Sequence, residues 1–131
     1  MNFKTLLTIN AVLAVVSGII FILIPGQILA SYGIRLSLMG EVIYQFWGAT
    51  LIGLGLLTWS VRPLEAPEFK KRIALYLSAI NGLSCLLALR GQTAGANALG
   101  WSTVVVYMLM AAGFGYFYIK TAKGKVLCKT E

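Results

Sequence analysis

Four long apolar runs dominate this sequence of 131 residues, and none of them contains an acidic or basic side chain. An α-helix rises about 1.5 Å per residue, so about 20 apolar residues are needed to cross the roughly 30 Å hydrocarbon layer of a bilayer. Each run comes close to that length, although the third is the shortest. We therefore predict an all-α integral membrane protein, a four-helix bundle that forms a single domain over residues 1–131. The expected helices cover residues 6–24, 42–61, 73–89 and 101–119.

The composition argues against a soluble helical protein. Only 11% of the residues are charged and 59% are hydrophobic, whereas about a quarter of the residues of a soluble domain are charged. So few charges cannot cover a globular surface in water. Transmembrane strands are also unexpected, because the sequence shows no alternation with a period of two. The first run is longer than the roughly 7–15 residues of a signal-peptide core, so we expect a retained helix that ends at Pro25.

The basic residues predict the orientation of the chain. Nine of the eleven lie on one side of the expected spans, whereas only Arg35 and Arg90 lie on the other. Because cytoplasmic loops collect Lys and Arg, we expect both termini in the cytoplasm and a multi-pass protein of the cell membrane. The same placement at the ends of apolar runs argues against a nucleic-acid partner, despite a formal net charge of +7. The nine residues are Lys4, Arg62, Lys70, Lys71, Arg72, Lys120, Lys123, Lys125 and Lys129.

Two connecting segments differ in character. The connector 62–72 ends in Lys70, Lys71 and Arg72, which either only set the topology or also contact anionic lipid headgroups. The segment 26–40 is too apolar to extend into water, so it is expected to lie in the outer interface or to fold back over the bundle.

The second expected span carries small residues on two faces. Glu41, Gln45, Gly48 and Gly55 fall on one stripe at helical spacing. Ala49 and Gly53 form a small-residue pair on another face, which is a common packing motif of membrane helices. We expect these faces to contact other helices, within the chain or in a partner. The expected packing residues are Gly48, Ala49, Gly53, Gly55, Ala111 and Gly115.

Polar side chains mark the expected interior of the bundle. Asn10 and Ser17 share a face of the first span, and Ser78 and Asn81 share a face of the third. Inside lipid, such residues hydrogen-bond across helices or line a path for a solute. Packing seams are the commoner explanation, and the ligand path stays open as the alternative.

A polar mouth is expected at the outer end of the bundle. Glu41 is the single acidic residue on that side, where Arg35 and Arg90 are the only cations. An ion pair between Glu41 and one of these arginines is the economical arrangement, and Gln45 and Asn81 would continue the polar path inward. The alternative is that all three charged groups are hydrated separately at the interface.

The residues that most enzymes use are scarce. The chain has no histidine and no aspartate, which removes the commonest general base and the commonest metal ligand. No nucleotide-binding fingerprint is present, because the glycines near residue 54 lie inside an apolar helix. We therefore expect a protein that is not an enzyme and that holds neither a cofactor nor a metal.

One pattern covers about the first half of the chain: Pro25-Gly26, Tyr32-Gly33, Glu41, Trp47-Gly48-Ala49 and Gly53-Leu54-Gly55-Leu56. It resembles a family of small four-helix membrane proteins, bacterial or archaeal in type, whose function is unknown. In that family a proline ends the first helix, and a glycine-rich second helix follows a short outer segment. The resemblance implies a fold and no activity. The small multidrug transporters are similar in size, but they need an acidic residue in the first helix, where this chain has Asn10 and Ser17.

These features predict a non-enzymatic protein that works through partners or lipid. The favoured role is an accessory or scaffold subunit of a membrane assembly, packed against other subunits, a second copy or membrane lipid. The alternative is an oligomeric channel, or a transporter of a small solute or lipid with a polar path near Glu41, Gln45 and Asn81.

Overall fold

The computed structural model describes residues 2–64, 66–95 and 97–127, with side chains as far as residue 122. All regular structure in this part of the chain is helical, which confirms the predicted all-α class. Of the basic residues that predict the orientation, Lys129 lies outside the described residues, and Lys123 and Lys125 lie outside the described side chains. The helices are α1 (Phe3–Leu23), α2 (Pro25–Ser31), α3 (Leu38–Ser60), α4 (Pro67–Thr93) and α5 (Gly100–Leu127).

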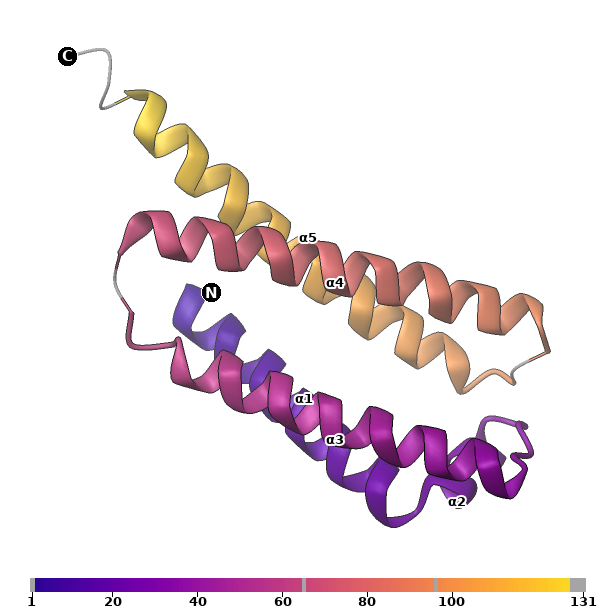
Figure 1. The fold of residues 1–131 in the computed structure, drawn as a ribbon. Coiled ribbons are helices and arrows are strands. Elements are labelled where there is room, and N and C mark those ends of the chain that lie inside the picture. The colour runs from indigo at the N-terminus through magenta and orange to yellow at the C-terminus, as the bar shows by residue number, and fades with distance from the viewer. Residues whose placement is uncertain (1, 65, 96, 128–131) are drawn as a thin grey trace.

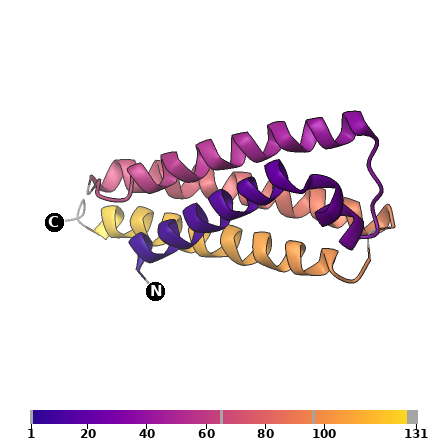
Figure 2. The same ribbon diagram turned by 90° about the horizontal axis from the view of Figure 1, so that it is seen from below.

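The four long helices form two antiparallel hairpins, α1 with α3 and α4 with α5 (Figure 1). Seen from below, the helices run side by side, and α1 begins at the same end of the bundle at which α5 ends (Figure 2). We call this the terminal end. We call the other end, which holds α2 and the links 32–37 and 94–99, the distal end (Figure 1).

The helix boundaries follow from local residue chemistry. Pro25 has no backbone N–H to continue α1, and it starts α2 at a position where that group is not needed. Gly33 and Gly95 adopt positive φ angles of 79° and 104° after α2 and α4, a conformation that glycine adopts without steric cost. Ser37 caps α3, because its hydroxyl accepts a hydrogen bond from the backbone N–H of Gly40.

Four helices, α1, α3, α4 and α5, are long and apolar enough to cross a membrane. α4 has 27 residues, a length of about 40 Å. It extends beyond the expected span 73–89 at both ends, because charged side chains continue the helix past the apolar run. Large apolar side chains such as Phe46 and Leu83 are 72% and 60% exposed. Such a surface suits lipid and marks this chain as a membrane protein.

Glycines let α1 and α3 approach until their backbones touch. A Cβ atom added to Gly48 would lie 2.6 Å from the carbonyl oxygen of Gly18, and one added to Gly55 would lie 2.9 Å from that of Ala11. Both distances are too short for non-bonded atoms. Gly48 and Gly55 are therefore the close-contact positions of this hairpin, and they face α1 of the same chain.

Small residues also form the seam between α4 and α5. The hydroxyl of Ser78 donates a hydrogen bond to the carbonyl oxygen of Ala111 at 2.9 Å. A Cβ atom on Gly115 would lie 3.3 Å from the same hydroxyl oxygen. A side-chain hydroxyl that bonds across helices is a typical stabilising contact inside lipid.

An apolar core joins the two hairpins near the terminal end. Leu6, Leu7, Leu77 and Phe114 form the buried apolar core there. Phe3 packs edge-on against Phe114, with 6.3 Å between the ring centroids. The middle of the bundle is not filled in the same way, and this difference creates the candidate site.

Candidate functional site

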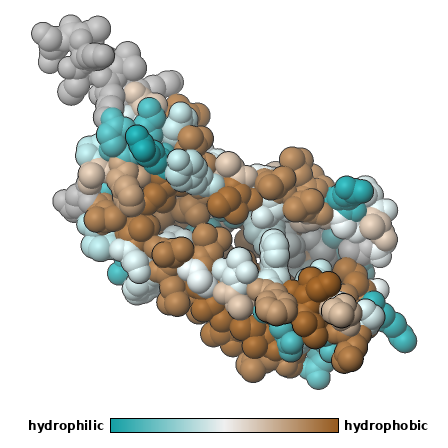
Figure 3. Space-filling model, in the orientation of Figure 1, coloured by the Kyte–Doolittle hydropathy of each residue, from teal (hydrophilic) through white to brown (hydrophobic). Residues whose placement is uncertain are grey.

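A cavity of about 400 Å³ separates the two hairpins in the middle of the bundle. All four long helices contribute to its wall, and Tyr32 contributes from the distal end. Figure 3 shows the corresponding hollow between the hairpins. The polar side chains in the wall include Asn10, Ser17, Thr50, Asn81, Ser84 and Tyr107.

The cavity has an open side between α3 and α4. No Cα atom of α3 lies within 8 Å of one in α4, and both helices are described along their whole length. On the opposite side, the backbones of α1 and α5 do approach within this distance. Because α3 and α4 face the viewer in Figure 1, Figure 3 looks into the open side. A molecule dissolved in the bilayer would meet the cavity from there.

Two asparagines form the polar floor of the cavity. The side-chain amide of Asn81 donates to the backbone carbonyl of Leu77 at 2.8 Å and to the amide oxygen of Asn10 at 3.5 Å. Asn10 is 8% exposed and Asn81 is 6% exposed. They join α1 to α4, so they connect the two hairpins where the apolar core ends. Both were among the buried polar residues expected from the sequence.

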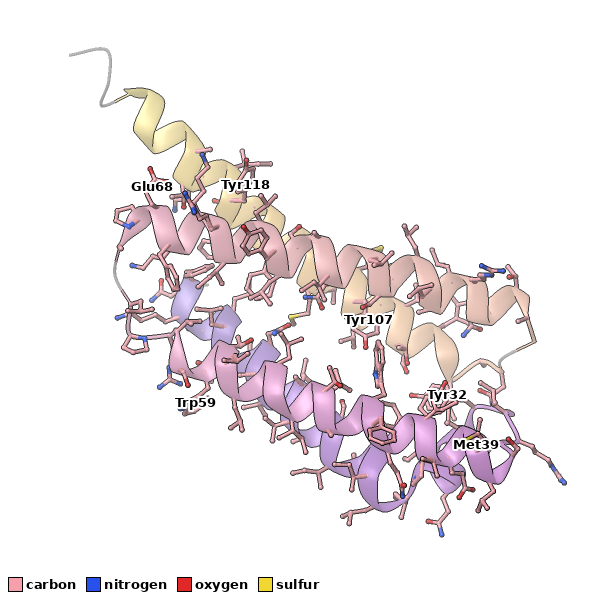
Figure 4. All side chains as sticks on the ribbon, viewed as in Figure 1. Tyr32, Met39, Trp59, Glu68, Tyr107 and Tyr118 are labelled. Carbon is pink, nitrogen blue, oxygen red and sulfur yellow. The ribbon has the colours of Figure 1, made fainter. Side chains whose placement is uncertain are left out.

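Hydrogen bonds close the distal end of the cavity. The side-chain amide of Asn97 donates to the carbonyl oxygen of Ser31 at 2.6 Å, and its backbone N–H donates to the carbonyl oxygen of Tyr32 at 3.1 Å. The hydroxyl of Thr103 donates to that of Tyr32 at 3.3 Å. The segment 26–40 thus folds back onto the link 94–99, one of the two arrangements expected for it. Figure 4 places Tyr32 at this end of the molecule.

The wall combines apolar side chains with hydroxyl groups. Leu51, Leu54, Ile80 and Met110 are among the apolar lining residues. The hydroxyls of Ser17, Ser84 and Tyr107 also face the cavity, and within the described part of the chain they have no hydrogen-bond partner. Figure 4 shows Tyr107 between the two hairpins. The cavity therefore offers free donors and acceptors in a mainly apolar surrounding, which is the usual composition of a small-molecule site.

None of the described side chains that line this cavity is charged. Within the described residues, no group of three or more His, Cys, Asp or Glu side chains could hold a metal ion. The chemistry that the cavity offers is hydrogen bonding by neutral groups and contact with apolar surface.

The expected outer mouth is not assembled. In the described part of the chain, Glu41 forms no ion pair with Arg35 or Arg90, and both arginines are exposed. Instead, the carboxylate of Glu41 lies against Gly26 of α2. α2, which the sequence did not predict, therefore lies beside Glu41 in this part of the chain, and the ion pair expected from the sequence is not formed there.

The side chain of Gln45 caps the end of α1 and does not extend a polar path. Its side-chain amide donates to the backbone carbonyl of Ile22 at 3.3 Å, one of the carbonyls that lose their helical partner where α1 stops. Gln45 does not line the cavity, and of the path expected near Glu41, Gln45 and Asn81 only Asn81 does so.

Ala49 and Gly53 lie on the exposed face of α3. No atom lies within 4 Å of the place where a Cβ atom of Gly53 would sit. Within the described chain, the face of α3 at Gly53 is therefore not covered by another helix. Helical spacing correctly puts Ala49 and Gly53 on one face and Gly48 and Gly55 on another, but α1 covers only the face that carries Gly48 and Gly55.

The basic cluster of α4 spreads over different faces of the helix. The ammonium group of Lys71 lies 5.5 Å from the ring centroid of Tyr118 on α5. Arg72 instead lines a groove between α4 and α3. Lys70 is half-buried.

The sequence reasoning missed Tyr32, Ser84, Asn97 and Thr103 as members of the site. Ser84 stands three residues after Asn81 on the same helix, so a 3.6-residue period extended from Asn81 could have found it. Asn97 and Tyr32 come from links, and nothing in their local sequence indicates that the two links meet.

A scan against protein-family models, a search of curated proteins and a search of solved structures each found no match. The function is therefore inferred from the geometry of this chain alone.

Proposed function

We propose that this chain is a non-enzymatic, multi-pass membrane protein that binds a small uncharged amphiphile in the cavity between its two hairpins. The observation that carries the proposal is the cavity of about 400 Å³, open between α3 and α4, with three hydroxyls in its wall that have no hydrogen-bond partner among the described residues. Ligand sites in proteins usually have volumes of about 300–1,000 Å³ and combine apolar walls with a few placed polar groups.

The chemistry of the wall limits the ligand. A charged group buried there would lose its hydration without gaining a countercharge, which is costly inside a membrane. A neutral hydroxyl, carbonyl or amide could bond to Ser84 or Tyr107 on one side of the cavity and to Ser17 on the other. The rest of the ligand must be apolar to match side chains such as Leu54 and Met110.

The orientation that we propose keeps both termini in the cytoplasm, on the basis of the basic residues. In this orientation the ligand enters from the bilayer between α3 and α4. Binding of this kind suits a carrier or a receptor for a membrane-dissolved molecule, and it corresponds to the transport alternative drawn from the sequence.

A cavity-filling substitution tests the proposal. In Ser84→Leu the larger side chain projects into the cavity, whereas in Ala79→Leu, the matched control, it lies on the exposed face of α4. Purified protein is heated with members of a panel of neutral alcohols, ketones and amides of increasing chain length. We expect some members to raise the melting temperature of the wild type and of Ala79→Leu, but not that of Ser84→Leu. Equal shifts in all three proteins, or no shift in any, would refute cavity binding.

A second function is favoured by the open small-residue face of α3. Ala49 and Gly53 are exposed, and no atom of the described chain lies within 4 Å of the place where a Cβ atom of Gly53 would sit. Such faces permit close approach of a partner helix in lipid. The accessory-subunit role predicts that Gly53→Leu dissociates a complex seen by native mass spectrometry of the wild type. A foreign subunit would identify an assembly, a ring of identical chains would identify a channel, and a monomeric wild type would rule out both.

A further inference from the structure

A second groove runs between α3 and α4 from the central cavity towards the terminal end. It encloses about 430 Å³. Leu54, Leu77 and Ile80 line both the groove and the cavity, so the two spaces adjoin. The remaining apolar wall of the groove includes Leu57, Val61, Phe69, Ile73 and Tyr76.

Among the residues that the structure describes, Arg72 is the only charged one that lines this groove. It is exposed, and within the described residues it has no hydrogen-bond or ion-pair partner. Arg62, another cation near the terminal end, is already engaged. Its guanidinium lies 4.0 Å from the ring centroid of Trp59 and donates a hydrogen bond to the hydroxyl of Thr8 at 3.1 Å. A free guanidinium at one end of an apolar groove is complementary to an anion that carries an apolar chain.

We propose that the groove binds one anionic phospholipid, with its phosphate on Arg72 and one acyl chain along α3 and α4 towards Ile80. Arginine suits the headgroup because its planar fork can donate two parallel hydrogen bonds to a phosphate. The distance from Arg72 to Ile80 along α4 is about 12 Å, so the groove accommodates part of a chain. Arg72 also lies in the first turns of α4, near the boundary of the apolar span, where a lipid headgroup belongs.

The bound lipid would cover part of the open side of the bundle. Its chain would reach the residues shared by the groove and the central cavity, and would therefore regulate access of the uncharged amphiphile from the bilayer. The lipid site itself does not depend on the proposed cavity ligand, because Arg72 and the groove wall exist whether or not the cavity is filled.

The lipid site is tested with Arg72→Gln and with Arg90→Gln as the matched control. Arg90 is an exposed arginine near the opposite end of the same helix, and it lines neither space. Each protein is equilibrated in mild detergent with phosphatidylglycerol or with phosphatidylcholine, and lipid adducts are counted by native mass spectrometry. We expect one retained phosphatidylglycerol on the wild type and on Arg90→Gln, and about tenfold weaker retention on Arg72→Gln, because a hydrogen bond to a charged group is lost.

Three results of the lipid measurement overturn the proposal. They are equal retention of phosphatidylglycerol by all three proteins, equal retention of the two lipids by the wild type, and displacement of the lipid by glycerol phosphate, which lacks acyl chains. A cross-link from a cysteine at Tyr76 to a second copy of the chain would also overturn it, because another protein would then occupy the groove. Ser84→Leu should retain phosphatidylglycerol, so failure of the cavity proposal is distinguishable from failure of the lipid site.

Discussion

Gly48→Ala adds a single methyl group to the seam where α1 and α3 touch. The same change at Gly53 adds it to the exposed face of α3, so the two variants compare the two faces. The added methyl group would lie 2.6 Å from the carbonyl oxygen of Gly18, 3.0 Å from Cγ1 of Ile22 and 3.1 Å from Cβ of Phe21. The Ile22 contact could be relieved by rotation of a side chain. The Gly18 contact could not, because the oxygen belongs to the backbone of a helix, so the two helices must move apart.

The magnitude follows from comparison with Gly53→Ala on the same helix. At Gly53 the new methyl group meets no atom within 4 Å, so only the helix propensity changes, by about 1 kcal/mol in favour of alanine. Gly48→Ala receives the same gain in propensity, but it also overpacks the seam at a cost of about 1–3 kcal/mol. The difference in unfolding free energy between the two variants isolates the steric cost, and we expect Gly53→Ala to be more stable by about 1–3 kcal/mol.

The assay is equilibrium unfolding of both variants in the same mild detergent, followed by circular dichroism. Thermal melting of the same samples gives an independent ranking. If the two variants are equally stable, the close contact between α1 and α3 is not present in the protein, and the arrangement of this hairpin is wrong.

Three further predictions concern the buried asparagines, the distal end and the orientation of the chain. Asn81→Leu should lower the unfolding free energy by about 1–3 kcal/mol, because it leaves Asn10 buried without its partner. Adding Asn10→Leu should restore part of this loss, which a double-mutant cycle measures. Asn97→Ala removes the side-chain bond that closes the distal end, so amide hydrogen exchange of the link 32–37 should accelerate while that of the α1–α3 seam stays unchanged. Single cysteines placed at Leu64 and Ala98 in a cysteine-free background should react with an impermeant reagent from opposite sides of the membrane, Leu64 only from the cytoplasmic side; the reverse result contradicts the orientation.

The all-helical class was predictable because hydropathy is a property of one segment at a time. A charge-free run of membrane-spanning length indicates a helix whatever its neighbours are. The same rule predicted too short a helix for α4. Lys70, Lys71 and Arg90 end the apolar run, but the hydrogen-bonded backbone of the helix continues through them. α2 has only seven residues, which is too short to show a helical period.

The packing of α3 was predictable in part for a related reason. Helical spacing puts Gly48 and Gly55 on one face and Ala49 and Gly53 on another, and both faces meet the sequence criterion for close packing. Which face another helix covers depends on the position of α1. The close contacts of α1 with this face are made by Gly18 and Ala11, whose carbonyl oxygens lie against Gly48 and Gly55. Neither residue carries a polar side chain that would mark the contact in the sequence.

The cavity shows why the site needed the structure. Asn10 and Ser17 lie seven residues apart, on the same face of α1 and with similar polarity, yet Asn10 is bonded to the opposite hairpin and Ser17 faces open space. Small polar residues can either pack between helices or line a ligand path. The sequence favoured packing for both residues because packing seams are the commoner case. The outcome depends on how far apart the hairpins stand, and two features distant in sequence set this spacing: the core around Phe114 at one end and the bonds of Asn97 at the other. Between these two regions of contact, the same kind of polar helix face that could have packed against a neighbouring helix instead lines the cavity.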